Sequence, residues 1–457
     1  MTSEIDQIFN CPSCHKNFLL LHDKYYSCPS CLQRFPLVGY IPWLIESPNA
    51  SLEEWKGQFK YLLQVLEKEA DLMKMDLQRK DISQSTSLRL RKLLQAKVEQ
   101  KKIMIELLSP LEINDNGSVA LSEALKTKLP FSQNLMSYYD NLHRDWTWGD
   151  RENEASLACI KKVIDGNNSN LGKFLVLGGG GCRLPYDIHR SFSPKCTVVV
   201  DINPLLLLSA RKIIRGKTLK LYEFPIAPKD LSSFGVLRKC KAPEKIEKNF
   251  EFVFADVSNA PFNRSTFDTI LTPWLIDIIA EDPREFFPKI NYLLANNGRW
   301  INFGSLVFNG RGPASNYSIE EVREIISSSG FEIENEVFES IPYMQSPDSC
   351  HGRLEKIFCF SAKKIKDVEI NEFKKHDVLP PWLSSTKNPV PKLSEFEVLK
   401  SMYSIYLDVL GEIDGNKSIE DISRIFAPKY KLSFDEATSS ITRYLTRTFQ
   451  DSVEKKL

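Results

Sequence analysis

A buried strand that runs directly into four glycines constrains this 457-residue chain more than any other feature. In the run KFLVLGGGGCRLPYDI, residues 173–188, an apolar strand precedes the glycines and a helix start follows them. Glycine accepts positive φ and lets the backbone approach a ligand closely. The next apolar run, residues 196–200, ends at Asp201, where a carboxylate can accept hydrogen bonds from both hydroxyls of a ribose. The pattern predicts an α/β, Rossmann-like sheet with a nucleotide-type cofactor site.

The third position of the glycine turn indicates which cofactor is favoured. A dinucleotide-binding turn reads G-x-G-x-x-G, whereas Gly178 and Gly180 are followed here by Arg183. S-adenosylmethionine has no pyrophosphate and does not need the third glycine, so the sequence favours it over NAD. Asp256, after the apolar residues 252–254, is predicted to lie at the amino edge of the adenine. A Rossmann-like helix start that binds no nucleotide is the alternative.

Two Cys-x-x-Cys pairs near the N-terminus form the strongest local pattern. Cys11 and Cys14 lie before, and Cys28 and Cys31 after, a segment that reads as two short strands around residues 23–24. Four thiolates at this spacing suit one structural zinc ion in a zinc ribbon, residues 1–48. A disulfide framework or a set of unrelated thiols is the alternative. The segment resembles the zinc-ribbon modules that serve as activator subunits of RNA and protein methyltransferases, which implies a scaffolding role.

Composition bears on partners and on location. The net charge of +1 provides no global basic field for nucleic acid, and 42% hydrophobic with 26% charged residues is ordinary for a globular protein. No apolar run approaches the roughly 20 residues of a membrane helix. The N-terminus has neither the basic start nor the apolar core of a signal peptide. We therefore expect a cytoplasmic protein with reduced cysteines and no membrane partner.

Two further segments are predicted to be helical. Residues 49–130 form a helical linker region, with apolar residues at helical intervals and a polar cluster at 81–87 between two helices. Residues 393–457 contain two helix starts with capping boxes at Ser418 and Ser433. This tail resembles a small winged-helix module, similar to the peptide-binding domain of pyrroloquinoline-quinone biosynthesis. The resemblance implies a peptide or protein partner, and a plain packing domain is the alternative.

Five blocks within residues 131–366 resemble, in order and spacing, the carnosine N-methyltransferase family. They are residues 144–152, 177–184, 267–277, 300–306 and 317–331. The resemblance implies a class I S-adenosylmethionine-dependent methyltransferase domain that methylates an imidazole nitrogen of a small-molecule or peptide substrate. By matching position, Arg144 would contact the cofactor carboxylate and Asp277 would face the acceptor. The other cofactor residues are Gly178, Gly180, Arg183, Asp201, Asp256, Val257 and Thr272, and Tyr343 and Asn309 join Asp277 on the acceptor side.

The role of Asp277 is chemically sensible. Methyl transfer to a neutral imidazole needs a free lone pair on one ring nitrogen and in-line alignment. A carboxylate bonded to the other ring nitrogen would orient the ring and stabilise the imidazolium that develops. A strand-end aspartate that only caps a turn is the alternative.

The acceptor side also departs from the family pattern. Asn309 stands where the family carries a histidine, and Arg353 and Glu355 stand where it carries two tyrosines. His351 lies in the altered stretch, either as a replacement polar group or as an ordinary surface histidine. The acceptor is therefore predicted to be a histidine in a peptide or protein, or a histidine-derived metabolite, and not carnosine itself. An RNA methyltransferase and a non-catalytic cofactor-binding scaffold are the competing functions.

Overall fold

The computed structural model divides the chain into two compact units, Met1–Phe373 and Lys374–Leu457, and each is described by itself. The residues that the structure describes are 6–16, 18–112, 133–164, 170–308, 313–370 and 389–454. Among these residues, no helix is long and apolar enough to cross a membrane.

The first unit is built on a seven-stranded sheet in the order β12-β13-β11-β10-β5-β6-β9. Its parallel strands are β5 (Lys173–Leu177), β6 (Cys196–Asp201), β9 (Phe250–Phe254), β10 (Phe267–Pro273) and β11 (Leu294–Phe303). β12 (Phe331–Tyr343) and β13 (Arg353–Lys364) form an antiparallel pair, and β13 also runs antiparallel to β11. The strand order reverses between β5 and β10, and in open α/β sheets a ligand cleft forms outside the carboxyl ends of the strands at such a point.

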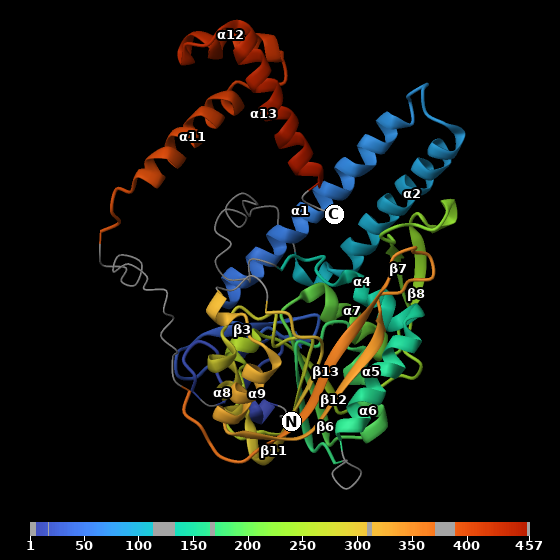
Figure 1. Cartoon of the computed structure of the whole chain (residues 1–457), viewed down its shortest axis with the longest axis vertical. Helices are drawn as coiled ribbons and strands as arrows, with labels where there is room; N and C mark the ends of the chain where they lie inside the picture. The colour runs from blue at the N-terminus through green and yellow to red at the C-terminus, as the bar shows by residue number, and fades with distance from the viewer. Residues whose placement is uncertain are drawn as a thin grey trace. The chain divides into compact units, whose positions relative to one another are not determined.

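Side chains of β5 alternate between two cores. Phe174 and Val176 pack in the core that includes α5 (Asp150–Val163), α6 (Arg183–Phe192) and α7 (Pro204–Ile214). Leu175 and Leu177 pack in the core that includes α8 (Pro283–Leu293) and α9 (Ile319–Ser328). Figure 1 shows the two helical layers on either side of the sheet. Because both faces are covered, the parallel strands are nearly continuous apolar runs.

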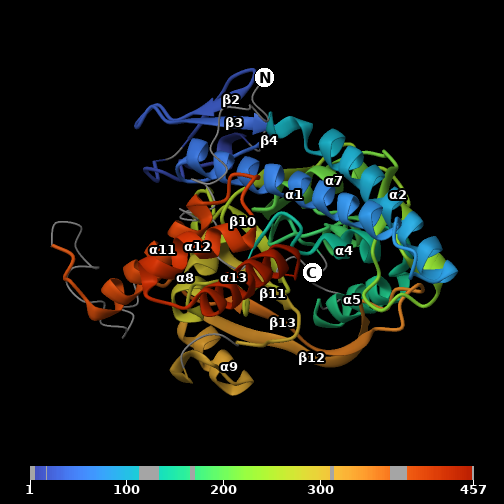
Figure 2. The ribbon, with the colours of Figure 1, turned by 90° about the horizontal axis from the view of Figure 1, so that it is seen from above.

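The N-terminal residues form a four-stranded antiparallel ribbon. Its strands are β1 (Leu20–Leu21), β2 (Tyr25–Ser27), β3 (Arg34–Val38) and β4 (Ile41–Pro42). The two short strands predicted around residues 23–24 are β1 and β2. The chain then runs along β9, where Trp43 forms a parallel bridge with Phe254. In Figure 2 the ribbon lies beside the start of α1 (Pro48–Asp76).

Two long helices follow the ribbon. α1 and α2 (Gln84–Leu107) pack against each other as a hairpin, with an ion pair of 2.9 Å between Lys97 and Glu69. The Ser83 hydroxyl caps α2 by accepting a hydrogen bond from the Thr86 backbone N–H. The break between the helices therefore falls at residues 77–83, slightly before the polar cluster 81–87 that the sequence indicated.

Shorter elements complete the first unit. α4 (Tyr139–His143) continues into a π-helical turn, Arg144–Trp148, and β7 (Leu219–Glu223) pairs with β8 (Val236–Cys240) as a hairpin. The 3₁₀ turns are Asp6–Ile8, Ser109–Leu111, Leu231–Ser233, Val257–Asn259 and Pro313–Ser315. A π-helical turn within a helical segment is frequent at functional sites, and this one carries Arg144.

The second unit consists of α11 (Ser394–Gly411), α12 (Ile419–Tyr430) and α13 (Phe434–Glu454), and residues 389–454 include no strand. α12 begins with a capping box of Ser418 and Asp421, and Ser433 and Glu436 make the same reciprocal bonds at α13, as the sequence predicted. A small core joins the helices through Val409, Ile422, Phe426, Ala427, Ala437 and Ile441.

Candidate active site

The glycine turn after β5 presents bare backbone to open space. Gly178 and Gly180 have φ of +76° and +51°, a region that favours glycine. The N–H groups of Gly178 and Gly179 both donate to the Val200 carbonyl, at 2.9 and 3.0 Å, which fixes the turn against β6. A Cβ added at Gly180 would meet no atom within 4 Å. The turn is therefore held from behind and open in front, as a ligand-cradling turn must be.

Two carboxylates lie at the ends of neighbouring strands beside this turn. Asp201 accepts backbone hydrogen bonds from Gly180 at 2.8 Å and from Asn203 at 2.9 Å, one on each oxygen. Burial raises the pKa of Asp201, and the backbone donors oppose that shift. Asp256, after β9, accepts from the Ser258 N–H at 2.9 Å. Because a carboxylate has about four acceptor positions, both can also accept hydrogen bonds from a ligand.

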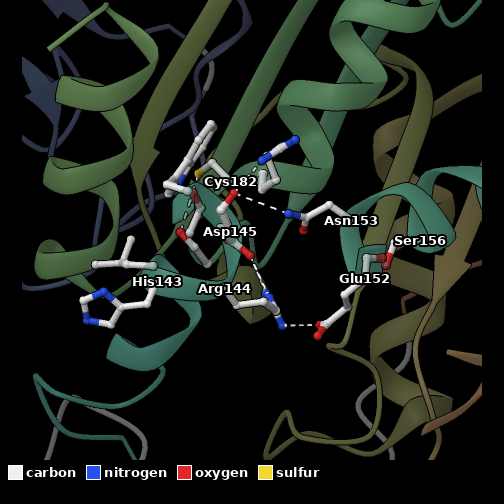
Figure 3. A network of polar contacts seen from close by, with 12 residues as sticks. His143, Arg144, Asp145, Glu152, Asn153, Ser156 and Cys182 are labelled. Carbon is white, nitrogen blue, oxygen red and sulfur yellow. Dashed lines mark hydrogen bonds and ion pairs between the residues drawn. The ribbon is translucent and has the colours of Figure 1, made fainter. Parts of the chain in front are cut away.

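Arg144 lies in a network of charged groups (Figure 3). Its Nε donates a hydrogen bond to Asp145 Oδ1 at 2.8 Å, Nη2 forms an ion pair with the same oxygen at 2.7 Å, and Nη1 forms an ion pair with Glu152 Oε1 at 3.1 Å. Burial alone would lower the pKa of Arg144, but the charges of Asp145 and Glu152 outweigh it and raise the pKa above its usual value. Glu152 is held in turn by the Met344 N–H at 2.9 Å. The arginine is thus fixed in orientation and permanently charged.

These groups surround one cavity of about 420 Å³, a volume typical of a small-molecule site. Eight of the residues predicted from the sequence line it: Arg144, Gly178, Gly180, Arg183, Asp201, Asp256, Val257 and Tyr343. Five further lining residues were not among the predicted site residues: Tyr138, Asp145, Glu152, Trp274 and Phe303. Pro273-Trp274 at the end of an apolar strand was the signal that could have identified Trp274.

Two other predicted residues, Thr272 and Asp277, are not among the residues that line this cavity. Thr272 is buried in the sheet, where its hydroxyl donates to Asn302 at 3.0 Å and accepts from the Trp300 indole at 2.9 Å. Asp277 is half-buried, and its Oδ2 accepts from the Val307 N–H at 2.9 Å. Asn309 lies outside the described residues.

Asp277 is nevertheless close to the cavity through Tyr138, which lines it. Burial raises the pKa of the Tyr138 phenol, and the charges of Tyr343, Asp201 and Asp277 raise it further. Leu275 and Ile278, on either side of Asp277 in the chain, also line the cavity, so Asp277 lies beside it.

Three aromatic side chains in the cavity lining, Trp274, Phe303 and Tyr343, pack together as an aromatic wall. The centroid of the Trp274 ring lies 5.0 Å from that of Tyr343 and 5.6 Å from that of Phe303. The angles between the ring planes are 56° and 87°, respectively. Trp274 has φ of +51°, and beside it Gly304 has φ of +153° and would place an added Cβ only 3.1 Å from the Trp274 Cα, so a larger residue there would be strained. The Arg353 guanidinium lies 4.6 Å from the Tyr343 ring centroid. This aromatic wall suits a ligand group that is flat, polarisable or cationic.

A second, smaller cavity of about 130 Å³ shares Tyr343 with the first. Asp140, Trp148, Glu223, His351 and Arg353 are among its lining residues. Burial raises the pKa of Asp140 to about 6, and the nearby Glu223 charge adds to the shift. His351 is exposed and lines this second cavity, which shares Tyr343 with the aromatic wall.

The four ribbon cysteines converge. All four sulfur atoms lie within 4.8 Å of one another, with Cys11 to Cys31 and Cys14 to Cys28 both at 3.6 Å. Sulfurs about 2.3 Å from a tetrahedral zinc ion are separated by about 3.8 Å, so the donor set fits that metal.

A sheet with this strand order, an antiparallel strand inserted beside β11, a glycine turn after β5 and acids after β6 and β9 defines a class I S-adenosylmethionine-dependent methyltransferase. The model of the carnosine N-methyltransferase family matches residues 123–366, just over half of the chain. The chain belongs to this family.

Solved structures similar to the chain were also found. One is a SAM-dependent methyltransferase from Methanosarcina mazei, with 12% identity, a TM-score of 0.32, and coverage of 45% of this chain and 96% of that one. A second comes from the complex of the Haloferax volcanii Trm112 methyltransferase activator with its methyltransferase partner, with 11% identity, a TM-score of 0.33, and coverage of 51% and 96%. A third is Haemonchus contortus phosphoethanolamine N-methyltransferase 2, with 15% identity, a TM-score of 0.30, and coverage of 47% and 53%. The comparison with curated proteins found no match.

Proposed function

We propose that this methyltransferase transfers a methyl group to an imidazole nitrogen of a histidine, within a peptide or protein or in a histidine-derived metabolite. The observation that carries the proposal is one continuous cavity. Its lining includes the glycine turn with Asp201 and Asp256 at one part and the aromatic pair Trp274 and Tyr343 at another. Membership of the carnosine N-methyltransferase family supports imidazole as the acceptor group.

The cavity offers a suitable protein group for each part of the cofactor. The backbone of residues 178–181 would lie against it, Asp201 would accept from the ribose hydroxyls, and Asp256 would accept from the adenine amino group. Val257 would contact the adenine. Arg144, held between two carboxylates, donates a hydrogen bond to Asp145 through Nε, so N–H groups on Nη1 and Nη2 can also bind the carboxylate of the methionine moiety.

Arg183 and Thr272 have supporting roles in this proposal. Arg183 lines the cavity and pairs with Asp187 at 2.9 Å, while its Nη1 donates to the Asp145 carbonyl at 2.7 Å. It would hold the turn that carries Arg144. Thr272 would act indirectly: its hydrogen bond to Asn302 would stabilise the strand ends that carry Trp274 and Phe303.

When bound, S-adenosylmethionine supplies an electrophilic methyl group on a sulfonium. The chain's residues would hold the imidazole against the aromatic wall with one nitrogen lone pair directed at that methyl. The new N–C bond forms as the S–C bond breaks, its electrons stay on sulfur, and the ring becomes an imidazolium. Asp277, oriented by the Val307 N–H, would hold the N–H of the other ring nitrogen and stabilise the positive charge. Tyr343 would position the ring, and Asn309 is proposed as a further polar contact.

Charged residues beside Tyr343 support an acceptor other than carnosine. Arg353, which lines the second cavity, and Glu355 replace two family tyrosines and form an ion pair of 2.5 Å, and the Arg353 guanidinium lies over the Tyr343 ring. Charged side chains at this position would suit the polar backbone and side chains of a peptide better than a small neutral pocket would. Residues 393–457 would add peptide contacts, residues 49–130 link the parts, and residues 131–366 carry the chemistry. One zinc ion held by Cys11, Cys14, Cys28 and Cys31 would stabilise the ribbon, residues 1–48.

Replacing Asp277 by asparagine tests the acceptor side. Removing one preorganised electrostatic group lowers turnover by about 30- to 1,000-fold, and we expect Asp277→Asn to do so with a histidine-containing acceptor. Affinity for S-adenosylhomocysteine, measured by calorimetry, should stay unchanged. Asp81→Asn, an exposed carboxylate paired with Arg79 on the α1–α2 turn, is the matched control. Equal turnover of the wild-type and Asp277→Asn proteins would exclude this role for Asp277.

A further inference from the structure

The loop after β9 forms one wall of the cofactor cavity. Ala255, Asp256, Val257 and Ser258 all line it, and Asp256 caps the 3₁₀ turn Val257–Asn259. The shape of this wall therefore depends on what holds the loop at its two ends.

The downstream end of the loop is held by the first Cys-x-x-Cys knuckle. Asn259 Nδ2 donates to the carbonyl of Pro12, which lies between Cys11 and Cys14, at 3.0 Å. Four more hydrogen bonds follow: Asn10 N to Pro261 O at 3.0 Å, Asn10 Nδ2 to Phe262 O at 2.9 Å, Asn263 N to Ile8 O at 2.9 Å, and Asn263 Nδ2 to Gln7 O at 3.1 Å. Residues 7–12 thus bind residues 259–263 along their length.

The upstream end is held by the strand that leaves the ribbon. The Leu44 N–H donates to the Phe254 carbonyl at 2.8 Å, one residue before Ala255. The Trp43 ring lies 5.0 Å from the Phe254 ring, and both side chains are fully buried. The cofactor wall, residues 255–258, is therefore fixed on both sides by the ribbon.

Packing connects these contacts to the metal-binding part of the ribbon. Phe9 lies 5.8 Å from Phe262 and 5.6 Å from Tyr26 between ring centroids, so it joins the loop to β2. The knuckle turn itself is closed by the His15 N–H donating to the Cys11 carbonyl at 2.8 Å. Structural zinc sites of this type supply folding free energy directly, and their small folds are lost without the metal.

We propose that the first zinc knuckle positions the cofactor wall, so that zinc binding in the ribbon sets the affinity of the methyltransferase site for its cofactor. The inference rests on the zinc and cofactor sites proposed above. Asn10 and Asn259 are the positioning residues, since they carry three of the hydrogen bonds across the junction.

The experiment measures S-adenosylhomocysteine binding by calorimetry and zinc content by elemental analysis on the full-length protein. Asn259→Asp keeps the shape of the side chain but removes the N–H donor to Pro12, and we expect about 3- to 10-fold weaker binding with one zinc per chain retained. Asn259→Gln, which restores a donor, should recover part of that loss. Asn335→Ala removes, from β12, an amide that donates to the carbonyl of Val163 at the end of α5, away from the junction, and this variant should bind like the wild-type protein.

Hydrogen exchange provides a second readout that does not depend on turnover. Removing zinc with a chelator should speed exchange at residues 254–263 and weaken S-adenosylhomocysteine binding by at least 10-fold. Equal affinities of the wild-type and Asn259→Asp proteins, or unchanged exchange at residues 254–263 after zinc removal, would overturn the positioning role alone. Failure of the zinc-loaded wild-type protein to bind S-adenosylhomocysteine would overturn the proposed cofactor site as well.

Discussion

At the scale of single residues, burial and neighbouring charges shift the pKa values of Arg144 and Asp140 away from those of isolated side chains. Arg144 is largely shielded from solvent, with its side chain 11% exposed, and it pairs with two carboxylates, as a desolvated guanidinium must. Asp140, four residues earlier in the chain, is influenced by a group of like charge and not by one of opposite charge. Its carboxyl group is largely desolvated, and its nearest charged influence is another carboxylate, Glu223.

Asp140 makes a pH-dependent contribution to stability whose sign follows from its pKa. Burial raises its pKa from 3.8 to about 6, so the folded state binds the proton more tightly than the unfolded state. Stability from this group is full below pH 3.8 and is lost as the pH rises through 6. Asp140→Asn should therefore raise the free energy of unfolding at pH 8 by about 1 to 3 kcal/mol, and by less at pH 5. Urea unfolding at both pH values checks this, and a gain that is larger at pH 5 would contradict it.

At the scale of elements, the local patterns were the predictable part. The glycine turn, the strands β5 and β6 and both capping boxes of the second unit appear where the sequence indicated, because each depends on residues close in the chain. The face on which a strand residue lies was harder to predict. Thr272 lies in the core while Pro273 and Trp274 line the cavity, and a shift of one residue along a strand reverses the face. The contact of residues 7–12 with 259–263 left no sequence signal, since it joins segments about 250 residues apart.

The glycine turn also supplies a matched pair of substitutions. A Cβ on Gly181 would lie 2.2 Å from Asp145 Oδ2, next to the Arg144 pair, whereas one on Gly180 would meet no atom. Gly181→Ala should lower the free energy of unfolding by about 1 to 3 kcal/mol. Gly180→Ala should cost about 1 to 2 kcal/mol for its positive φ and chiefly weaken S-adenosylhomocysteine binding, because the added methyl faces the cavity. Denaturant unfolding and calorimetry on both variants check the pair, and a more stable Gly181→Ala protein would contradict the packing.

At the scale of the whole molecule, each unit has features of its own. Among the described residues, those that line the cavity belong to the first unit, and the second unit has its own small core. Deleting residues 393–457 should therefore leave S-adenosylhomocysteine affinity unchanged while raising the Michaelis constant for a peptide acceptor. Steady-state kinetics on the truncated protein measure this, with a free histidine derivative as the acceptor that should be unaffected. A large loss of cofactor affinity on truncation would contradict the division.

The most direct test of the account is to locate the transferred methyl group. The purified, zinc-loaded protein is incubated with S-adenosylmethionine labelled on its methyl group, together with extract fractions containing peptides, proteins, metabolites and RNA. Fragmentation by mass spectrometry then locates the label. We expect a single methyl group on an imidazole ring nitrogen of a histidine, and we expect this label to be lost with the Asp277→Asn protein. A label found on RNA or on a carboxylate would contradict it.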